Sequence, residues 1–155
     1  MTNPPKQKPV LQQDEEGSYL LFSSADDTGK DRKLRIDFVH DDRYWRKLRG
    51  KNELLAKALG GAPASVYDLT LGLAEDAWTM ARLGFQVLGC EREELLVKLL
   101  SSAHGIALQT ESVKSVAERL QIRCSDSSDL LKDIVSGKVP RPDVIYIDPM
   151  FSIEV

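Results

Sequence analysis

From residue 64 onward, short apolar runs alternate with helix-like segments, and this alternation constrains the fold more than any other feature. The strand-like runs are SVYDL (65–69), FQVLGCE (85–91), QIRC (121–124) and DVIYID (143–148). The helix-like segments between them are AEDAWTMARLG (74–84), REELLVKLLSSA (92–103), SVKSVAERL (112–120) and SDLLKDIV (128–135). Strands that alternate with helices predict an α/β fold, with a parallel sheet covered by helices on both faces.

The N-terminal part of the chain has a different pattern. SYLLFSS (18–24) and KLRIDFV (33–39) resemble strands, and the turn-forming residues between them predict a small β-hairpin lobe. A helical segment over 42–59 follows and ends at Gly60-Gly61. The predicted organisation is a disordered tail, a small β lobe, a basic helix with its linker and an α/β domain, over residues 1–9, 10–41, 42–63 and 64–155.

Composition excludes several classes of protein. The net charge of −3 means that the chain as a whole is no polybasic nucleic-acid binder, so such a partner needs a local basic patch. Cys90 and Cys124 lack a C-x-x-C spacing and are interpreted as buried free thiols in a reducing compartment. His40 and His104 lack a ligand pattern, so no metal site is expected. Without a signal peptide or an apolar stretch of spanning length, we expect a soluble, cytoplasmic protein.

An acidic residue stands at the end of every predicted strand of the α/β domain: Asp68, Glu91, Asp126 and Asp148. In open parallel sheets, ligands bind outside the carboxyl ends of the strands. These four carboxylates are therefore expected to meet at one ligand site.

The loop after the first strand favours a cationic ligand. Gly72 lets the backbone approach a ligand closely, but Asp68, Glu75 and Asp76 would repel a phosphate group, which argues against NAD or ATP. S-adenosylmethionine (SAM) has an ammonium group, a sulfonium centre and no phosphate, so it suits this loop better. The alternative for Asp76 alone is a helix cap or a solvated charge.

Two further acids match the parts of a nucleoside. Glu91 ends the second strand about 20 residues after the glycine loop, where an acid commonly accepts hydrogen bonds from both ribose hydroxyls. Asp126 could accept a hydrogen bond from an adenine amine. The alternatives are a solvent-facing Glu91 at a helix start and an Asp126 that caps the helix after it.

The run DLTLGLAEDAWTMARLGFQVLGCERE (68–93), together with DVIYIDPMF (143–151), resembles the class I SAM-dependent methyltransferases. It is most similar to the bacterial small-subunit ribosomal RNA guanine methyltransferase J family, and the resemblance extends over about residues 33–151. It implies a Rossmann-like class I methyltransferase sheet, SAM as cofactor, and methylation of the exocyclic amine of a guanine in 16S ribosomal RNA.

The resemblance also assigns roles to residues. It places cofactor contacts at Glu75, Asp76, Glu91, Arg92, Asp126, Ser127 and Asp148. The family usually has Gly-Arg-Asp where this chain has Ala74-Glu75-Asp76, which leaves residue 75 a backbone role at most.

The D-P-M-F ending implies the catalytic loop. Asp148 and the carbonyl of Pro149 would accept hydrogen bonds from the target amine, and Phe151 would stack on a base flipped out of the RNA.

A basic cluster in the N-terminal half is the candidate RNA contact, and it comprises Arg43, Arg46, Lys47, Arg49 and Lys51. Such a cluster could bind the phosphates of small-subunit ribosomal RNA or of the ribosomal subunit. The alternative is a solvated helix face.

The sequence supplies only the first four of the seven strands of a class I methyltransferase sheet. Residues 143–148 would then form an exposed hydrophobic edge. We expect a fragment of a longer protein, a naturally short copy, or a sheet completed by a partner, for example in a homodimer. The functional alternatives are a non-catalytic module that binds cofactor or RNA, and an amine methyltransferase acting on another nucleic-acid base.

Overall fold

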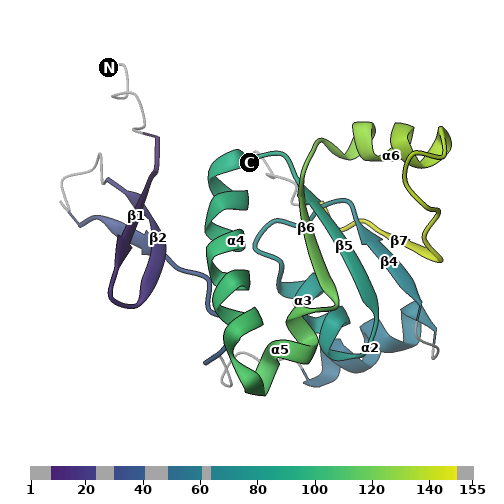
Figure 1. Ribbon diagram of the computed structural model, residues 1–155, viewed down its shortest axis with the longest axis horizontal. Coiled ribbons are helices and arrows are strands. Elements are labelled where there is room, and N and C mark those ends of the chain that lie inside the picture. Colours follow the sequence, from purple (N-terminus) through teal and green to yellow (C-terminus); the bar gives the residue numbers. More distant parts are fainter. Residues whose placement is uncertain (1–7, 24–29, 41–48, 61–63, 150–155) are drawn as a thin grey trace, which may run out of the picture.

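The computed structural model describes residues 8–23, 30–40, 49–60 and 64–149, with the backbone alone at 49–53. These residues form two sheets (Figure 1). The N-terminal sheet is antiparallel and comprises β1 (Val10–Asp14), β2 (Gly17–Phe22) and β3 (Arg32–Leu34), in that order. The second sheet is parallel in the order β6-β5-β4-β7, and comprises β4 (Ser65–Asp68), β5 (Gln86–Glu91), β6 (Leu120–Cys124) and β7 (Val144–Tyr146).

Helices connect the parallel strands, so the predicted α/β fold is confirmed. They are α2 (Arg49–Leu59), α3 (Glu75–Arg82), α4 (Glu94–Gln109), α5 (Glu111–Ala117) and α6 (Ser127–Val135). Figure 1 shows α3, α4 and α5 on one side of the sheet and α6 on the other. The chain moves from β4 outward to β5 and β6, then returns to pair β7 with the free side of β4. Right-handed crossovers on both sides of this reversal place helices on opposite faces.

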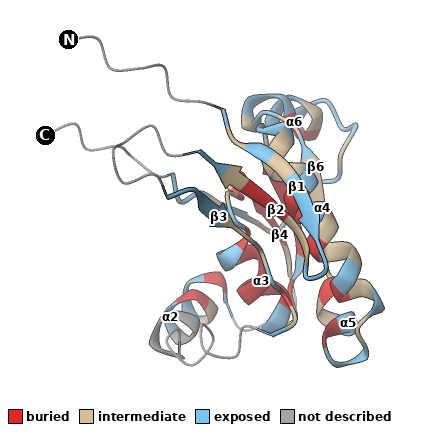
Figure 2. Cartoon of the chain, turned by 90° about the vertical axis from the view of Figure 1, so that its left-hand side faces the viewer, coloured by how far each residue is buried: buried red, intermediate tan, exposed pale blue. Residues whose placement is uncertain are grey.

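Each face of the parallel sheet has its own apolar core, because side chains alternate along a strand. Val66 of β4 belongs to the larger core, which includes Trp78 and Met80 of α3 and Leu100 of α4. The neighbouring Tyr67 belongs to the smaller core on the other face. That smaller core also contains Leu69, Cys90, Leu130 and Ile134. Cys90 is thus buried as predicted, whereas the prediction was wrong for Cys124, which is exposed at the end of the outer strand β6. Figure 2 shows the buried residues, in red, concentrated in such elements as α3.

Two predictions for the N-terminal lobe were wrong. β1 was missed, because its sequence VLQQD has few apolar residues and its side chains are mostly exposed, so backbone pairing with β2 defines it. The strand predicted over 33–39 ends at Leu34. The alternating apolar residues after it pack on the main core instead, and the Phe38 ring stacks on Trp78 with centroids 4.4 Å apart.

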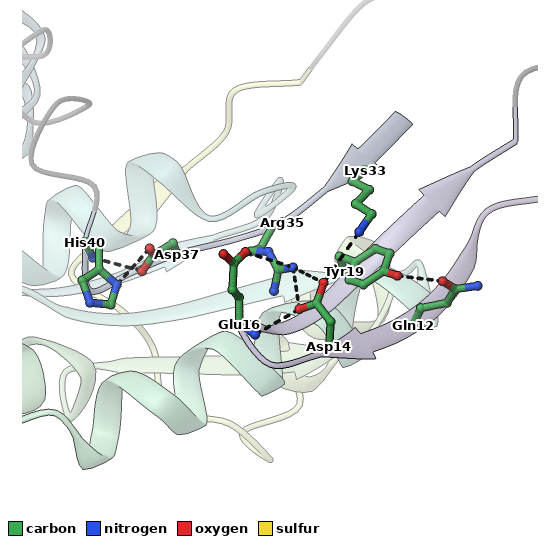
Figure 3. A network of polar contacts seen from close by, with 8 residues as sticks. All are labelled: Gln12, Asp14, Glu16, Tyr19, Lys33, Arg35, Asp37 and His40. Atoms are coloured by element: carbon green, nitrogen blue, oxygen red, sulfur yellow. Dashed lines mark hydrogen bonds and ion pairs between the residues drawn. The ribbon is translucent and has the colours of Figure 1, made fainter. Parts of the chain in front are cut away.

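Polar contacts hold the lobe together (Figure 3), and a further contact joins it to α4. Arg35 donates to both oxygens of Asp14 at 2.7 and 2.8 Å, and also pairs with Glu16 in the β1–β2 turn. The Ser18 and Ser102 hydroxyls lie 2.8 Å apart, which links β2 to α4. The lobe is thus attached to the α/β domain by the contact between Ser18 and Ser102 and by the packing of Phe38 on Trp78.

In the described part of the chain, no helix is long and apolar enough to cross a membrane.

Candidate functional site

The carboxyl ends of all four parallel strands open into one cavity of about 490 Å³. The residues predicted from sequence that line it are Gly72, Glu91, Arg92, Asp126, Ser127, Asp148 and Pro149. Glu91 and Asp148 come from strands β5 and β7, on either side of β4, and nevertheless face the same space. The expectation that the strand ends converge is met for these residues.

A larger cavity, of about 680 Å³, lies between the β1–β2 turn and α4. Among its charged lining residues, Asp14 and Glu16 both pair with Arg35. It also lies away from the strand ends, where open parallel sheets bind ligands. The strand-end cavity is therefore the candidate functional site.

The β4–α3 loop forms one wall of the strand-end cavity and is held close to β5. Gly72 and Ala74 both have left-handed backbones, with φ of 52° and 62°. Leu71 donates its backbone N–H to the Cys90 carbonyl at 3.2 Å. A Cβ atom on Gly89 would lie 2.3 Å from Cδ1 of Leu71, so any larger residue would force the buried Leu71 side chain to shift. Sequence reasoning missed Gly89, because the residue that requires it comes from another element.

Glu91 is oriented by two backbone groups. Its Oε2 accepts a hydrogen bond from the Gly72 N–H at 3.2 Å, and its Oε1 accepts one from the Glu93 N–H at 2.9 Å. A carboxylate has about four lone-pair sites, so each oxygen can accept a further hydrogen bond. The half-buried Glu91 is thus fixed at the cavity wall and can still bind two hydroxyls.

Asp126 lines the cavity and also caps α6. Its Oδ1 accepts hydrogen bonds from the backbone N–H and the hydroxyl of Ser128, at 2.8 and 2.7 Å, and these bonds lower the pKa of Asp126. The helix-cap alternative is therefore correct. The neighbouring Ser127 donates its hydroxyl to the Leu69 carbonyl, so this side chain ties α6 to the end of β4.

Asp68 lies outside the cavity lining and is only 2% exposed. Its Oδ1 accepts the backbone N–H of Thr70 at 2.9 Å. Burial raises the pKa of Asp68 to about 6, and the charges of Asp76 and Asp148 add to this effect. The side chain of Asp68 therefore stabilises the β4–α3 loop through its hydrogen bond to Thr70. The sequence had predicted that Asp68 contacts the cofactor.

Glu75 and Asp76 begin α3 and also lie outside the cavity lining. Asp76 accepts a hydrogen bond from the Tyr146 hydroxyl at 2.7 Å. Burial is the main cause that raises the pKa of Tyr146, and the contact with Asp76 raises it further. Tyr146 was missed from sequence, where it is one apolar position of a strand.

The remaining predicted residues lie outside the described residues or are described only as backbone. Phe151, Arg43, Arg46 and Lys47 lie outside the described residues, and Arg49 and Lys51 are described only as backbone of α2.

The side chains of the cavity fit a nucleoside with a cationic centre. Glu91, Asp126 and Asp148 supply carboxylates, and Arg92 is the cation in the lining. With Glu93, which also lines it, the cavity has four carboxylates around one space, and these favour an ammonium or sulfonium group and disfavour a phosphate. No cluster of metal-ligating side chains occurs among the residues that the structure describes.

The sequence model of one protein family, described as "Putative SAM-dependent methyltransferase", matches residues 1–154. The chain belongs to the SAM-dependent methyltransferase family. The family predicted from the D-L-T-L-G-L and D-P-M-F motifs is thereby confirmed.

Curated relatives of this SAM-dependent methyltransferase chain include proteins named ribosomal RNA small subunit methyltransferase J. The protein from Neisseria gonorrhoeae (strain NCCP11945) is 31% identical over 148 residues, which cover 92% of this chain and 59% of the relative. The protein from Pseudomonas aeruginosa (strain LESB58) is 33% identical over 147 residues, covering 92% and 54%. The chain thus spans less than two thirds of the length of these relatives.

Solved structures show the same fold. A SAM-dependent methyltransferase from Neisseria gonorrhoeae superposes with a TM-score of 0.80 at 27% identity, over 97% of this chain and 60% of that one. A SAM-dependent methyltransferase from Agrobacterium tumefaciens has a TM-score of 0.52 at 12% identity, over 92% and 40%, and shares the fold alone.

Proposed function

We propose that this chain binds SAM in the strand-end cavity and transfers its methyl group to the exocyclic amine of a guanine in 16S ribosomal RNA. The observation that carries the proposal is the shared cavity of Glu91, Asp126 and Asp148 in a member of the SAM-dependent methyltransferase family. The names of the relatives support ribosomal RNA as the substrate.

Each wall of the cavity would hold a different part of the cofactor. Glu91 would accept hydrogen bonds from the ribose hydroxyls, and Asp126 with the backbone of Ser127 would face the adenine. Gly72 lets the loop backbone approach the methionine end, where Arg92 of the cavity lining would bind the carboxylate. A role for Asp76 at the ammonium group rests on the family resemblance, because Asp76 begins α3 outside that lining. Asp68 contributes indirectly, by holding Thr70 in the same loop.

The acceptor would bind at the end of β7. When bound, SAM supplies the electrophilic methyl group, so the protein needs mainly to position the amine. Hydrogen bonds from the amine to Asp148 and to the Pro149 carbonyl would direct its lone pair toward the cofactor side of the cavity. Phe151 would stack on the flipped base.

The basic residues of the 43–51 segment would bind phosphates of the RNA or of the small ribosomal subunit. Exchanging Arg46 and Lys47 for glutamates should flatten the salt dependence of RNA binding, and an unchanged slope would contradict this role.

A ribosomal substrate would place the protein in the cytoplasm. A homodimer through the outer edge of the sheet, where Ile145 of β7 and Ile147 just beyond it are 44% and 60% exposed, is a separate expectation that light scattering tests.

The experiment combines calorimetry with S-adenosylhomocysteine and transfer of tritiated methyl groups to small subunits from cells that lack the methyltransferase. The proposal expects both binding and transfer, with the label on a guanine. Binding without transfer would favour the non-catalytic module, and a label on another base would favour the alternative substrate.

Asp148→Ala separates the two steps. It should abolish transfer and leave most of the affinity for S-adenosylhomocysteine, because the remaining cavity wall is unchanged. Transfer by Asp148→Ala at the wild-type rate would contradict the role of Asp148 as an acceptor ligand.

A further inference from the structure

Thr70 connects the cofactor loop to the segment that carries the acceptor residues. Its Oγ1 accepts a hydrogen bond from the backbone N–H of Asp148 at 2.8 Å, although 78 residues separate the two. Its own backbone N–H donates to Asp68 Oδ1 at 2.9 Å. The parallel pairing of β4 with β7, in which Asp68 lies opposite Tyr146, brings these groups together.

The direction of these hydrogen bonds is set by their chemistry. A backbone N–H can only donate, so the Thr70 oxygen is the acceptor and its hydroxyl hydrogen remains to be donated. Asp68 Oδ1 lies 3.4 Å from this oxygen and can receive that hydrogen. Asp68 is buried at the end of β4, so its side chain is held in place by the surrounding protein. The hydrogen bonds from Asp68 through Thr70 to Asp148 therefore connect Asp148 to a rigid part of the sheet.

Asp148 depends on this contact because the strand has already ended. The last β7 pair is at Tyr146, whose carbonyl accepts the Leu69 N–H at 3.0 Å. Ile147, Asp148 and Pro149 continue beyond the sheet and are exposed. In the described part of the chain, the Thr70 hydroxyl fixes the backbone between the end of β7 and Pro149.

We propose that Thr70 is a positioning residue, whose hydroxyl holds the Asp148–Pro149 backbone in register with the cofactor loop. The inference rests on the proposed function. Positioning errors of about 1 Å can cost about 100-fold in rate. Removing the hydroxyl should therefore reduce turnover and leave the affinity for the cofactor nearly intact.

The test compares Thr70→Val, which keeps the shape but lacks the hydroxyl, with Thr70→Ser, which retains it. Thr79→Val is the matched control, because the buried Thr79 hydroxyl donates to the Glu75 carbonyl at 2.9 Å and lies outside the cavity lining. Four quantities are measured on the full chain: kcat and KM for methyl transfer to small subunits, the Kd for S-adenosylhomocysteine, and the exchange rate of the Asp148 amide hydrogen by NMR.

We expect Thr70→Val to lower kcat about 10- to 100-fold. Its Kd for S-adenosylhomocysteine should stay within about threefold, and the Asp148 amide should exchange about five- to tenfold faster, as for one lost hydrogen bond. Thr70→Ser should restore kcat and amide protection, and Thr79→Val should change neither.

A wild-type kcat in Thr70→Val, an unchanged exchange rate at Asp148, or failure of serine to restore kcat would each overturn the inference. A loss confined to the affinity for S-adenosylhomocysteine would also overturn it, because Thr70 would then be a ligand of the cofactor. If the wild-type chain transfers no methyl group, the proposed function fails, and the exchange rates of the valine and serine variants still decide whether Thr70 holds Asp148.

Discussion

The Tyr146 hydroxyl donates a 2.7 Å hydrogen bond to the Asp76 carboxylate, and so joins the end of β7 to the first turn of α3. The two residues are 70 positions apart in the sequence. Together with the contact between Thr70 and Asp148, this bond makes the second side-chain link between the cofactor loop and the acceptor segment. The two sides of the proposed reaction are therefore connected through side chains as well as through the sheet.

Tyr146→Phe should destabilise the fold by about 1.5–3 kcal/mol, because the lost hydrogen bond has a charged acceptor. It should also weaken binding of S-adenosylhomocysteine, since Asp76 would lose the group that orients it. Urea unfolding and calorimetry measure the two effects. Tyr67→Phe is the matched control: its hydroxyl donates to the Pro140 carbonyl at 3.0 Å, so it should cost about 0.5–1.5 kcal/mol and leave binding unchanged.

Glu91→Gln should weaken binding of S-adenosylhomocysteine about 10- to 100-fold, because a charge-assisted contact to a diol would be lost. The amide also has one acceptor oxygen in place of two, so its NH₂ group would face the N–H of either Gly72 or Glu93. Glu94→Gln, an exposed change in the first turn of α4, is the control and should bind normally. Equal affinities for the two variants would contradict the ribose-binding role of Glu91.

Gly89→Ala should destabilise the protein by about 1–3 kcal/mol, because the new methyl group would overlap the Leu71 side chain. In a Leu71→Ala background the same change should cost much less, and a double-mutant cycle from urea unfolding measures this coupling. Gly105→Ala is the matched control, and it should change the free energy of unfolding in the opposite direction. A Cβ atom there meets nothing within 4 Å in the middle of α4, so helix propensity should stabilise the fold by about 0.5–1 kcal/mol.

Local sequence pattern was sufficient to predict the sheet and the convergence of its strand ends. Alternating strands and helices predicted the parallel sheet, and acids at the strand ends predicted that Glu91, Asp126 and Asp148 would share a cavity. These predictions succeed because parallel strands bring their carboxyl ends to one edge whatever the details of packing.

Contacts between distant segments lay beyond the sequence pattern. Thr70 and Tyr146 have partners more than 60 positions away, and nothing near either residue identifies them. Gly89 is required by the position of Leu71, and β1 by its pairing with β2. Asp68 was assigned to the ligand because its chemistry suits a cation, but its burial depends on how the loop folds over it.

Asp68→Asn should change how stability depends on pH. The pKa of Asp68 is about 6 in the folded protein, above its usual value of 3.8, because burial disfavours the carboxylate. The folded state therefore holds this proton more tightly than the unfolded chain does. As the pH rises from about 4 to about 6, Asp68 should reduce stability by up to roughly 3 kcal/mol, at 1.36 kcal/mol per unit of pKa. Asparagine has no proton to lose and its oxygen can still accept the Thr70 N–H.

Between pH 4 and pH 7, the free energy of unfolding of Asp68→Asn should therefore rise relative to that of the wild type. Urea titrations at several pH values measure this difference. Asp143→Asn should behave in the opposite way. Hydrogen bonds from the Ser65 N–H and hydroxyl lower the pKa of Asp143, so that carboxylate stabilises the fold above about pH 4 and loses its effect as the pH falls further. A constant difference between Asp68→Asn and wild type across this range would mean that Asp68 is as well solvated in the folded protein as in the unfolded chain.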